Sequence, residues 1–158
     1  MSSAAASLYG KSRSANQAFK ECLDKRKIIF FPRAKGLAKE ELLAAEEDLA
    51  EARDRFRHGK SKYATINAYY AIFHASRALI YSKGYRERSH YCLSVALEAL
   101  FVEEGLLAGR YVRLLQDTMA LREDAGYGGS YSKEGASMSI SNAGEFIGIA
   151  GDLIRSGR

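Results

Sequence analysis

The sequence contains one proline and no tryptophan among its 158 residues, and it has no long uninterrupted apolar run. Proline breaks helices and removes a backbone donor, so its scarcity leaves room for long helices. A transmembrane helix needs about 20 consecutive apolar residues and is therefore excluded. The N-terminus also lacks the hydrophobic stretch of a secretory signal. We expect a cytoplasmic protein that has no membrane partner.

Cysteine and histidine are scarce as well. The two cysteines, Cys22 and Cys92, lie far apart, and the three histidines are His58, His74 and His90. No C-x-x-C pair or Cys–His spacing typical of zinc sites occurs, so we expect no metal and no other cofactor. In a reducing cytoplasm the two cysteines should be free thiols. The sequence also has neither a P-loop nor a dinucleotide-binding fingerprint.

The residues that are abundant, Ala, Leu, Glu, Lys and Arg, are strong helix formers, and apolar residues recur at helical spacing. This pattern predicts a short helix followed by five longer ones. The predicted helices cover residues 14–26, 38–58, 62–83, 90–104, 110–125 and 133–155. We find no strictly alternating strand pattern and no internal repeat. The sequence therefore predicts an all-α fold, an antiparallel bundle of four or five helices.

The first 36 residues differ from the rest and are interpreted as a separate N-terminal segment. Residues 1–13 are small and polar, a composition typical of disorder. Residues 28–36, IIFFPRAKG, are expected to be an extended connection, because the residue before a proline is disfavoured in a helix. The four adjoining apolar side chains must pack on the bundle or on a partner. The bundle itself is expected over residues 37–158.

Basic residues outnumber acidic ones by 24 to 19, which gives a formal net charge of +5. They gather in two stretches, one between Lys20 and Lys39 and one between Arg53 and Lys62. A basic balance suits an anionic partner such as a nucleic acid or an acidic protein. An ordinary solvated surface explains the same pattern, and both interpretations stay open.

A stripe of polar and aromatic side chains follows one side of the helix predicted over residues 62–83. Its members are spaced by four, three and four residues, so they share one face: Tyr70, His74, Arg77 and Tyr81. Two phenols, an imidazole and a guanidinium in a row indicate either a hydrogen-bonded seam between helices or a ligand-binding site.

A second candidate site lies where the helix of residues 90–104 begins, at Arg86, Arg88, Ser89 and His90. Free backbone N–H groups, the helix dipole and nearby guanidinium groups would together favour a bound anion. The alternative interpretation is ordinary helix capping by Ser89 with solvated charges around it.

These segments resemble a known family. AYYAIFHASRAL, then RSH, then LREDAGYG, and finally a helix containing Ala and Phe are similar to the small stand-alone prokaryotic HEPN-domain proteins, over about residues 37–156. Such proteins are often encoded beside a minimal nucleotidyltransferase. The resemblance implies a helical bundle, a homodimer, and a nucleotidyltransferase-like protein as partner.

The HEPN ribonucleases share an Arg followed, after four to six residues, by a His. The Arg holds the scissile phosphate and the His transfers a proton, across a dimer cleft. Here the matching segment starts at Arg122 and includes Asp124, and Tyr127 stands where the His is expected. A phenol with an ordinary pKa of about 10 is a poor base at neutral pH. These three residues could still bind a phosphate or a nucleotide, and His74 or His90 could replace the missing base.

Three functions are compatible with these observations. The first is the HEPN component of a HEPN–nucleotidyltransferase toxin–antitoxin-like pair, which binds a nucleotide, a phosphate or its protein partner and has a degraded ribonuclease motif. The second is a metal-independent ribonuclease toxin that acts on RNA, so whether the chain is an enzyme stays open. The third is a helical scaffold without a small ligand. Gly144, Gly148 and Gly151, on one side of the last helix, would suit a homodimer contact or a close helix crossing within the chain equally well.

Overall fold

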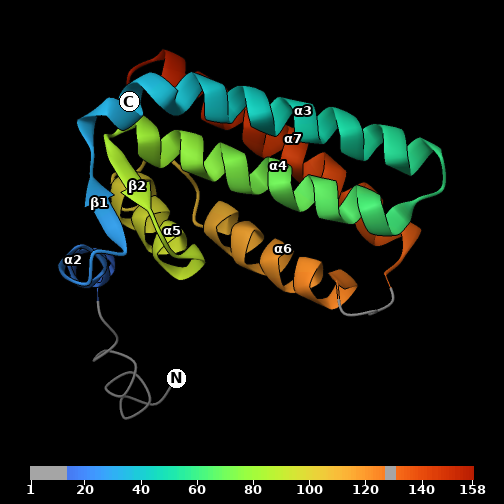
Figure 1. Ribbon diagram of the computed structural model, residues 1–158, viewed down its shortest axis with the longest axis horizontal. Coiled ribbons are helices and arrows are strands. Elements are labelled where there is room, and N and C mark those ends of the chain that lie inside the picture. Colours follow the sequence, from blue (N-terminus) through green and yellow to red (C-terminus); the bar gives the residue numbers. More distant parts are fainter. Residues whose placement is uncertain (1–13, 127–130) are drawn as a thin grey trace, which may run out of the picture.

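The computed structural model describes residues 14–126 and 131–158, and for residues 121–126 it describes the backbone alone. The predictions that concern residues 1–13 and Tyr127 lie outside the described residues. Within the described part the chain folds as an elongated bundle of helices with a small two-stranded ribbon at one end (Figure 1). The predicted all-α class is confirmed.

Each predicted helix has a counterpart in the structure. In chain order these are α2 (Ala15–Asp24), α3 (Ala38–Arg57), α4 (Ser61–Ser82), α5 (His90–Leu97), α6 (Arg110–Gly126) and α7 (Lys133–Arg155). The predicted helix over residues 90–104 is shorter than expected, because α5 passes into a π-helical turn, Glu98–Val102. A 3-10 turn, Pro32–Leu37, leads into α3.

Local sequence signals explain where several helices begin and end. Serine hydroxyls accept hydrogen bonds from the first helical turn at three N-termini: Ser14 for α2, Ser89 for α5 and Ser132 for α7. Such caps satisfy backbone N–H groups that have no partner within the helix. The chain leaves α3 at Gly59 and α4 at Gly84, where φ is 74° and 85°. Glycine adopts this left-handed conformation without a steric cost.

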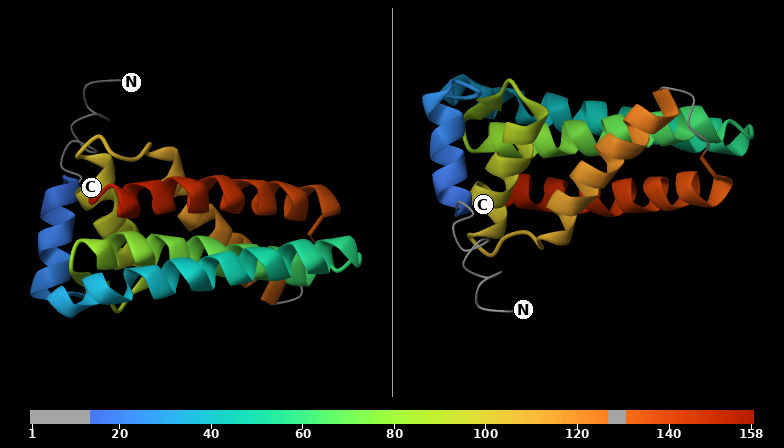
Figure 2. Two further views of the ribbon diagram at one scale, coloured as in Figure 1. Left: turned by 90° about the horizontal axis from the view of Figure 1, so that it is seen from above. Right: turned by 90° about the horizontal axis from the view of Figure 1, so that it is seen from below.

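Helix α4 lies at the centre of the bundle, between α3, α6 and α7 (Figure 2). Its fully buried side chains include Tyr69, Ile72 and Leu79, and the core is completed by Leu115 of α6 and Phe146 of α7. Burying a side chain of this size contributes about 1.5–3 kcal/mol. In the described part of the chain, no helix has the length and apolar character needed to cross a membrane.

The ribbon is a feature that the sequence pattern did not predict. Strand β1 (Ile28–Phe30) pairs antiparallel with β2 (Tyr85–Glu87), with Ile28 opposite Glu87 and Phe30 opposite Tyr85. Three-residue strands are too short for an alternating pattern to stand out. The apolar run that starts at Ile28 is only partly covered, since Ile28 is buried and Phe30 is 61% exposed.

The two cysteines correct a prediction. Cys22 of α2 and Cys92 of α5 form a disulfide, with their Cα atoms 5.9 Å apart, so the expectation of free thiols is wrong. Helix α2 lies across the end of the bundle against α5 (Figure 2), which brings together two residues that are 70 positions apart in the sequence. The disulfide fixes the N-terminal segment to the bundle.

The glycines of α7 lie in three different surroundings. A Cβ at Gly144 would lie 3.3 Å from a guanidinium nitrogen of Arg53 and 3.8 Å from the Leu49 side chain, so side chains of α3 cover this glycine. Gly148 has open space beside it among the described residues, and Gly151 lies against Arg155 of its own helix. Gly144 therefore faces side chains of α3 within the chain, while the close helix crossing and the homodimer stay predictions.

Candidate functional site

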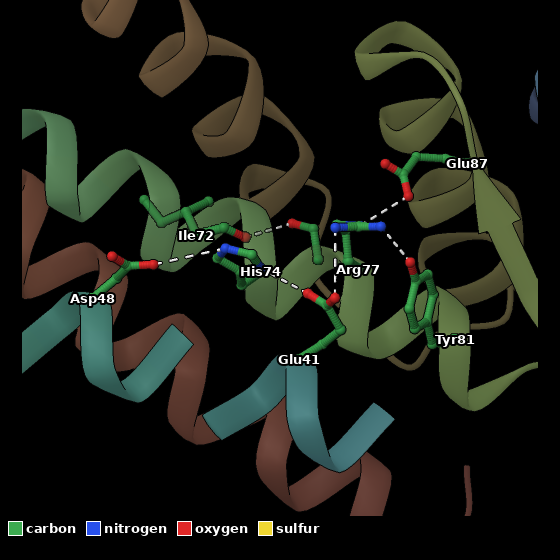
Figure 3. Close-up of polar contacts among 8 residues, drawn as sticks. Glu41, Asp48, Ile72, His74, Arg77, Tyr81 and Glu87 are labelled. Atoms are coloured by element: carbon green, nitrogen blue, oxygen red, sulfur yellow. Dashed lines mark hydrogen bonds and ion pairs between the residues drawn. The ribbon is translucent and has the colours of Figure 1, made fainter. Parts of the chain in front are cut away.

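The polar stripe of α4 meets α3 and β2 in a cluster of charged side chains (Figure 3). We call this cluster the polar seam, and it comprises Glu41 and Asp48 of α3, His74, Arg77 and Tyr81 of α4, and Glu87 of β2. Three separate elements of the fold thus supply charged groups to one place. The stripe predicted from the spacing exists in the structure, and its members from His74 to Tyr81 share this surface.

Arg77 is at the centre of the polar seam. Its Nε donates a hydrogen bond to Oε1 of Glu87 at 3.0 Å, and one of its terminal nitrogens lies 3.5 Å from Oε1 of Glu41. Its other terminal nitrogen donates to the Tyr81 hydroxyl. Burial lowers the pKa of Arg77, but the charges of Glu87 and Glu41 outweigh burial and raise it. Arg77 is therefore a permanent cation that already has two carboxylate partners.

Glu87 is the most buried carboxylate of the polar seam, with a side chain that is 6% exposed. Burial raises its pKa, while the charge of Arg77 and the hydrogen bond from Arg77 lower it in part. Burial likewise raises the pKa of Tyr81. Both groups lie in an environment that penalises their charged forms, and the guanidinium between them offsets part of this penalty for Glu87.

His74 connects α4 to α3. Its Nδ1 donates a hydrogen bond to Oε2 of Glu41 at 2.7 Å, and its Nε2 lies 3.7 Å from Oδ2 of Asp48. Asp48 also accepts a hydrogen bond from the Asn67 amide at 3.5 Å. Burial raises the pKa of Asp48, and the charge of His74 lowers it in part. Both ring nitrogens of His74 thus face carboxylate oxygens, as in a hydrogen-bonded seam between helices.

The arrangement has a clear chemical consequence. Three carboxylates face one guanidinium and one imidazole, so negative groups are in excess. A phosphate approaching Arg77 would have to displace Glu41 or Glu87 and would be repelled by the remaining carboxylates. The polar seam thus joins helices and a strand, and its charges favour a cation over an anion. Among the described residues, however, no group of three His, Cys, Asp or Glu is arranged to hold a metal ion.

The remaining aromatic groups of the stripe lie nearby. Tyr70 is half-buried and its ring centroid lies 5.0 Å from that of Tyr69. The ring of Phe73, which follows on the same helix, lies 5.5 Å from His74 and under the guanidinium of Arg77 at 5.4 Å. Tyr70 precedes His74 by one helical turn and so lies beside the polar seam.

The second predicted site is near the start of α5. Ser89 caps this helix by accepting a hydrogen bond from the backbone N–H of Cys92 at 3.2 Å. His90 is exposed, and its ring centroid lies 5.2 Å from that of Phe73. Arg86 and Arg88 are exposed residues of the ribbon and its end. The capping interpretation thus describes Ser89, while anion binding at this helix end stays a prediction.

The third group of predicted residues is on α6 and after it. Arg122 and Asp124 belong to the last turns of α6, where the structure describes the backbone alone, and Tyr127 lies outside the described residues. Helices α4 and α6 run in opposite directions, so the end of α6 lies towards the start of α4 (Figure 1). The polar seam is built on the other half of α4. The roles of Arg122, Asp124 and Tyr127 stay predictions.

Sequence reasoning missed the carboxylates that complete the polar seam. Glu41 and Asp48 are seven residues apart, which places both on one face of α3, and this spacing was a usable signal. Glu87 had no such signal, because its position depends on the pairing of β2 with β1. A further polar contact was also missed, in which Arg110 and Tyr111 of α6 bind Glu145 of α7; the Tyr111 hydroxyl donates to Glu145 at 2.6 Å.

A comparison with known families supports the sequence resemblance. The model of the HEPN domain matches residues 38–153, which cover α3 to α7 almost completely. This chain belongs to the HEPN family. The match leaves out α2, β1 and the 3-10 turn, so the N-terminal segment that the disulfide joins to α5 lies outside the matched domain.

A similar protein is known from the archaeon Methanocaldococcus jannaschii, where its name is "Putative toxin MJ0605". The two sequences are 34% identical over 83 residues, which is 52% of this chain and 62% of the other protein. The chain therefore matches less than two thirds of that relative's length. The likeness supports a toxin-like HEPN protein.

Proposed function

We propose that this chain is the HEPN component of a toxin–antitoxin-like pair and acts as a binding module that is held by a nucleotidyltransferase-like protein. The observation that carries the proposal is the likeness to a relative named as a toxin, within a HEPN match that covers most of the chain. A toxin of this kind needs a partner that restrains it.

The contacts of His74 favour a binding module over a ribonuclease. A general base must have a ring nitrogen free to reach the proton that it removes. Both ring nitrogens of His74 face carboxylates of α3, at 2.7 Å and 3.7 Å. The ring of His90 lies beside two rings in the middle of α4, 6.4 Å from Tyr69 and 5.2 Å from Phe73. His74 is thus already held by carboxylates of α3, while a joint role of His90 and Arg122 belongs to the ribonuclease alternative.

The segment from Arg122 to Tyr127 is the proposed contact for a nucleotide or phosphate. A guanidinium binds phosphate through two parallel hydrogen bonds, and a phenol can donate one more without acting as a base. The polar seam supports this choice indirectly, because its own cation is already paired with Glu41 and Glu87. A homodimer would bring two such segments into one assembly.

Three measurements test the proposal. Induced expression in a bacterial host should stop growth, and co-expression of a nucleotidyltransferase-like partner should restore it. Calorimetric titration with ATP and AMP should show binding that Arg122→Ala abolishes, while Arg155→Ala, an exposed arginine at the end of α7, serves as the matched control. Purified protein should leave RNA intact.

Two results would contradict the proposal. RNA cleavage that Arg122→Ala abolishes would establish the ribonuclease alternative instead. Unimpaired growth, no nucleotide binding at millimolar concentration and no complex with a nucleotidyltransferase-like protein would together favour the scaffold.

A further inference from the structure

A hollow of about 540 Å³ lies between α2, α5 and the first half of α6. Its volume falls within the range of small-molecule sites, about 300–1,000 Å³. One wall comes from the start of α2 and consists of Ser14, Ala15 and Ala18, which lie outside the matched HEPN domain. We call this hollow the α2 pocket. It forms only where the N-terminal segment packs on the bundle, so the matched domain alone does not contain it.

The disulfide holds this wall in place. Cys22 of α2 is joined to Cys92 of α5, and both residues are buried. Helix α2 has ten residues, and a helix of this length is marginally stable on its own in water. The covalent link therefore keeps α2 against α5 whether or not a ligand is present. A pocket whose walls are already fixed loses less conformational freedom when it binds, which favours affinity.

The π-helical turn after α5 supplies two carboxylates to the pocket. Glu98 and Glu103 both line it, although they are five residues apart. In an α-helix, side chains five residues apart point about 140° away from each other. Here the backbone N–H of Glu103 donates to the carbonyl of Glu98 at 2.9 Å, and this wider turn brings the two residues to one side. Such turns are rare and are frequent at functional sites.

The charged side chains of the pocket have no partners of their own. The side chains of Glu98, Glu103 and Arg113 take part in no ion pair or hydrogen bond with any residue that the structure describes. A Cβ at Gly109 would lie 3.7 Å from a guanidinium nitrogen of Arg113 and 3.8 Å from Val102, so Arg113 extends towards the π-helical turn. Two unpaired carboxylates on one side of a turn repel each other and cost stability. A ligand that carries cations would relieve this repulsion.

Aliphatic side chains complete the pocket. Val95 of α5, Val112 of α6 and Ala18 of α2 line it, so each of the three helices contributes an apolar group. The methylene groups of a ligand would be removed from water at this surface. An aliphatic surface and charged groups of both signs therefore line the same hollow. This combination suits a small molecule that has charged ends and an aliphatic body.

We propose that the α2 pocket binds a basic amino acid or a short basic peptide. Two ammonium groups of the ligand pair with Glu98 and Glu103, and its carboxylate pairs with the guanidinium of Arg113. A phosphate is disfavoured, because the two carboxylates repel it. Arg113 precedes Arg122 by nine residues on α6, so the pocket is separate from the proposed nucleotide contact. The inference therefore goes beyond the proposed function.

The test is isothermal titration calorimetry of the full chain with lysine and with the dipeptide Lys-Leu. Both should bind in the millimolar range or more tightly; a higher affinity for Lys-Leu assigns the pocket to peptides, and equal affinity assigns it to the amino acid. Replacing Glu98 and Glu103 together by Gln should weaken binding at least about tenfold, as expected for lost charge-assisted hydrogen bonds. The control, Glu46→Gln with Glu134→Gln, removes the same charge from exposed positions of α3 and α7 and should leave the affinity nearly unchanged.

Changes in the ligand show which groups meet. Lys-Leu acetylated on both amino groups keeps its carboxylate but loses its cations, so it should bind the natural chain at least about tenfold more weakly than Lys-Leu does. The variant with Gln at positions 98 and 103 should bind this acetylated dipeptide as well as the natural chain does, which also shows that its pocket is intact. Arg113→Gln should weaken binding of Lys-Leu and leave binding of its C-terminal amide unchanged.

Methyl signals in NMR spectra locate the site. During titration with Lys-Leu the signals of Val95 and Val112 should shift, while the signals of Leu43, which is 56% exposed on α3, should stay in place. Arg122→Ala should leave binding of Lys-Leu unchanged, so the failure of the nucleotide contact and the failure of this pocket are distinguishable. No binding of either ligand at millimolar concentration, or equal affinity of the two double variants for Lys-Leu, would overturn the proposal.

Discussion

Strand β2 separates two charged regions that are built in opposite ways. On its inner face Glu87 is nearly buried and pairs with Arg77 at 3.0 Å, within a polar seam where negative groups are in excess. On its outer face Arg86 and the neighbouring Arg88 are exposed, next to Lys27 and without carboxylate partners among the described residues. The difference shows that charged residues in one short segment can have unlike roles. The paired ones stabilise the fold, and the unpaired ones remain available to a ligand.

The largest loss of stability is expected when Arg77, the central cation of the polar seam, is replaced. Arg77→Met keeps much of the side-chain volume but leaves Glu87 and Glu41 without their cation. Breaking a buried pair by removing one partner costs about 3–5 kcal/mol, and the partial exposure of Arg77 places the loss near the lower end. Urea unfolding monitored by circular dichroism measures it.

The control for Arg77 is Arg155→Met on α7. That arginine pairs with Asp152, and both side chains are well exposed, at 68% and 80%. Its replacement should change the free energy of unfolding by no more than about 0.5 kcal/mol. Equal losses in the two variants would show that the polar seam contributes no more than a surface ion pair.

The second effect concerns the disulfide, which fixes α2 and hence the turn that carries Lys25 to Lys27. Replacing Cys22 and Cys92 by Ala should lower the free energy of unfolding by about 2–4 kcal/mol, because the unfolded chain regains the freedom that the link removes. Reductant should lower the stability of the natural chain towards that of the variant and leave the variant unchanged.

Hydrogen exchange shows which region the disulfide supports. In the double variant the amide of Arg88, bonded to Lys27, should exchange faster, while the amide of Arg77 within α4 should keep its protection. A parallel loss of protection at both sites would mean that the two faces of β2 unfold as one unit, contrary to the comparison.

The local features of this fold could be predicted from the sequence, and most of its tertiary contacts could not. Helical periodicity and serine caps depend on residues three to four positions apart, so the bounds of α7 and the stripe from His74 to Tyr81 were accessible. The pairing of β1 with β2 and the disulfide depend on how distant segments meet. For the same reason the sequence could not decide whether Arg77 belongs to a ligand-binding site or to a seam between helices. Its partners Glu41 and Glu87 come from α3 and β2, which are distant in the sequence.

A smaller effect should appear in the pH dependence of stability. Burial raises the pKa of Asp48 in the folded state, so the folded chain holds that proton more tightly than the unfolded chain. Asp48 therefore contributes most to the stability of the fold at pH values below its ordinary pKa. This contribution is lost as the pH rises through the raised pKa of the folded state. Relative to the natural chain, Asp48→Asn should lose less stability between acid and neutral pH.

Urea unfolding at a series of pH values tests the role of Asp48, with the exposed Asp117→Asn on α6 as the control. The curve of the control should run parallel to that of the natural chain. If the Asp48→Asn curve also ran parallel, the carboxylate would be as well solvated in the folded chain as in the unfolded one.

The smallest change in stability is expected on the outer face of the ribbon, and it should be a gain instead of a loss. Lys27→Glu places a carboxylate beside Arg88, to which residue 27 is joined by a backbone hydrogen bond. A cross-strand pair of opposite charges contributes about 0.2–1 kcal/mol, so the variant should be slightly more stable than the natural chain. Lys27→Gln, which removes the repulsion without adding attraction, should lie between the two. A Lys27→Glu chain that is less stable than the natural one would mean that Lys27 has a favourable role in the fold, and the contrast between the two faces of β2 would disappear.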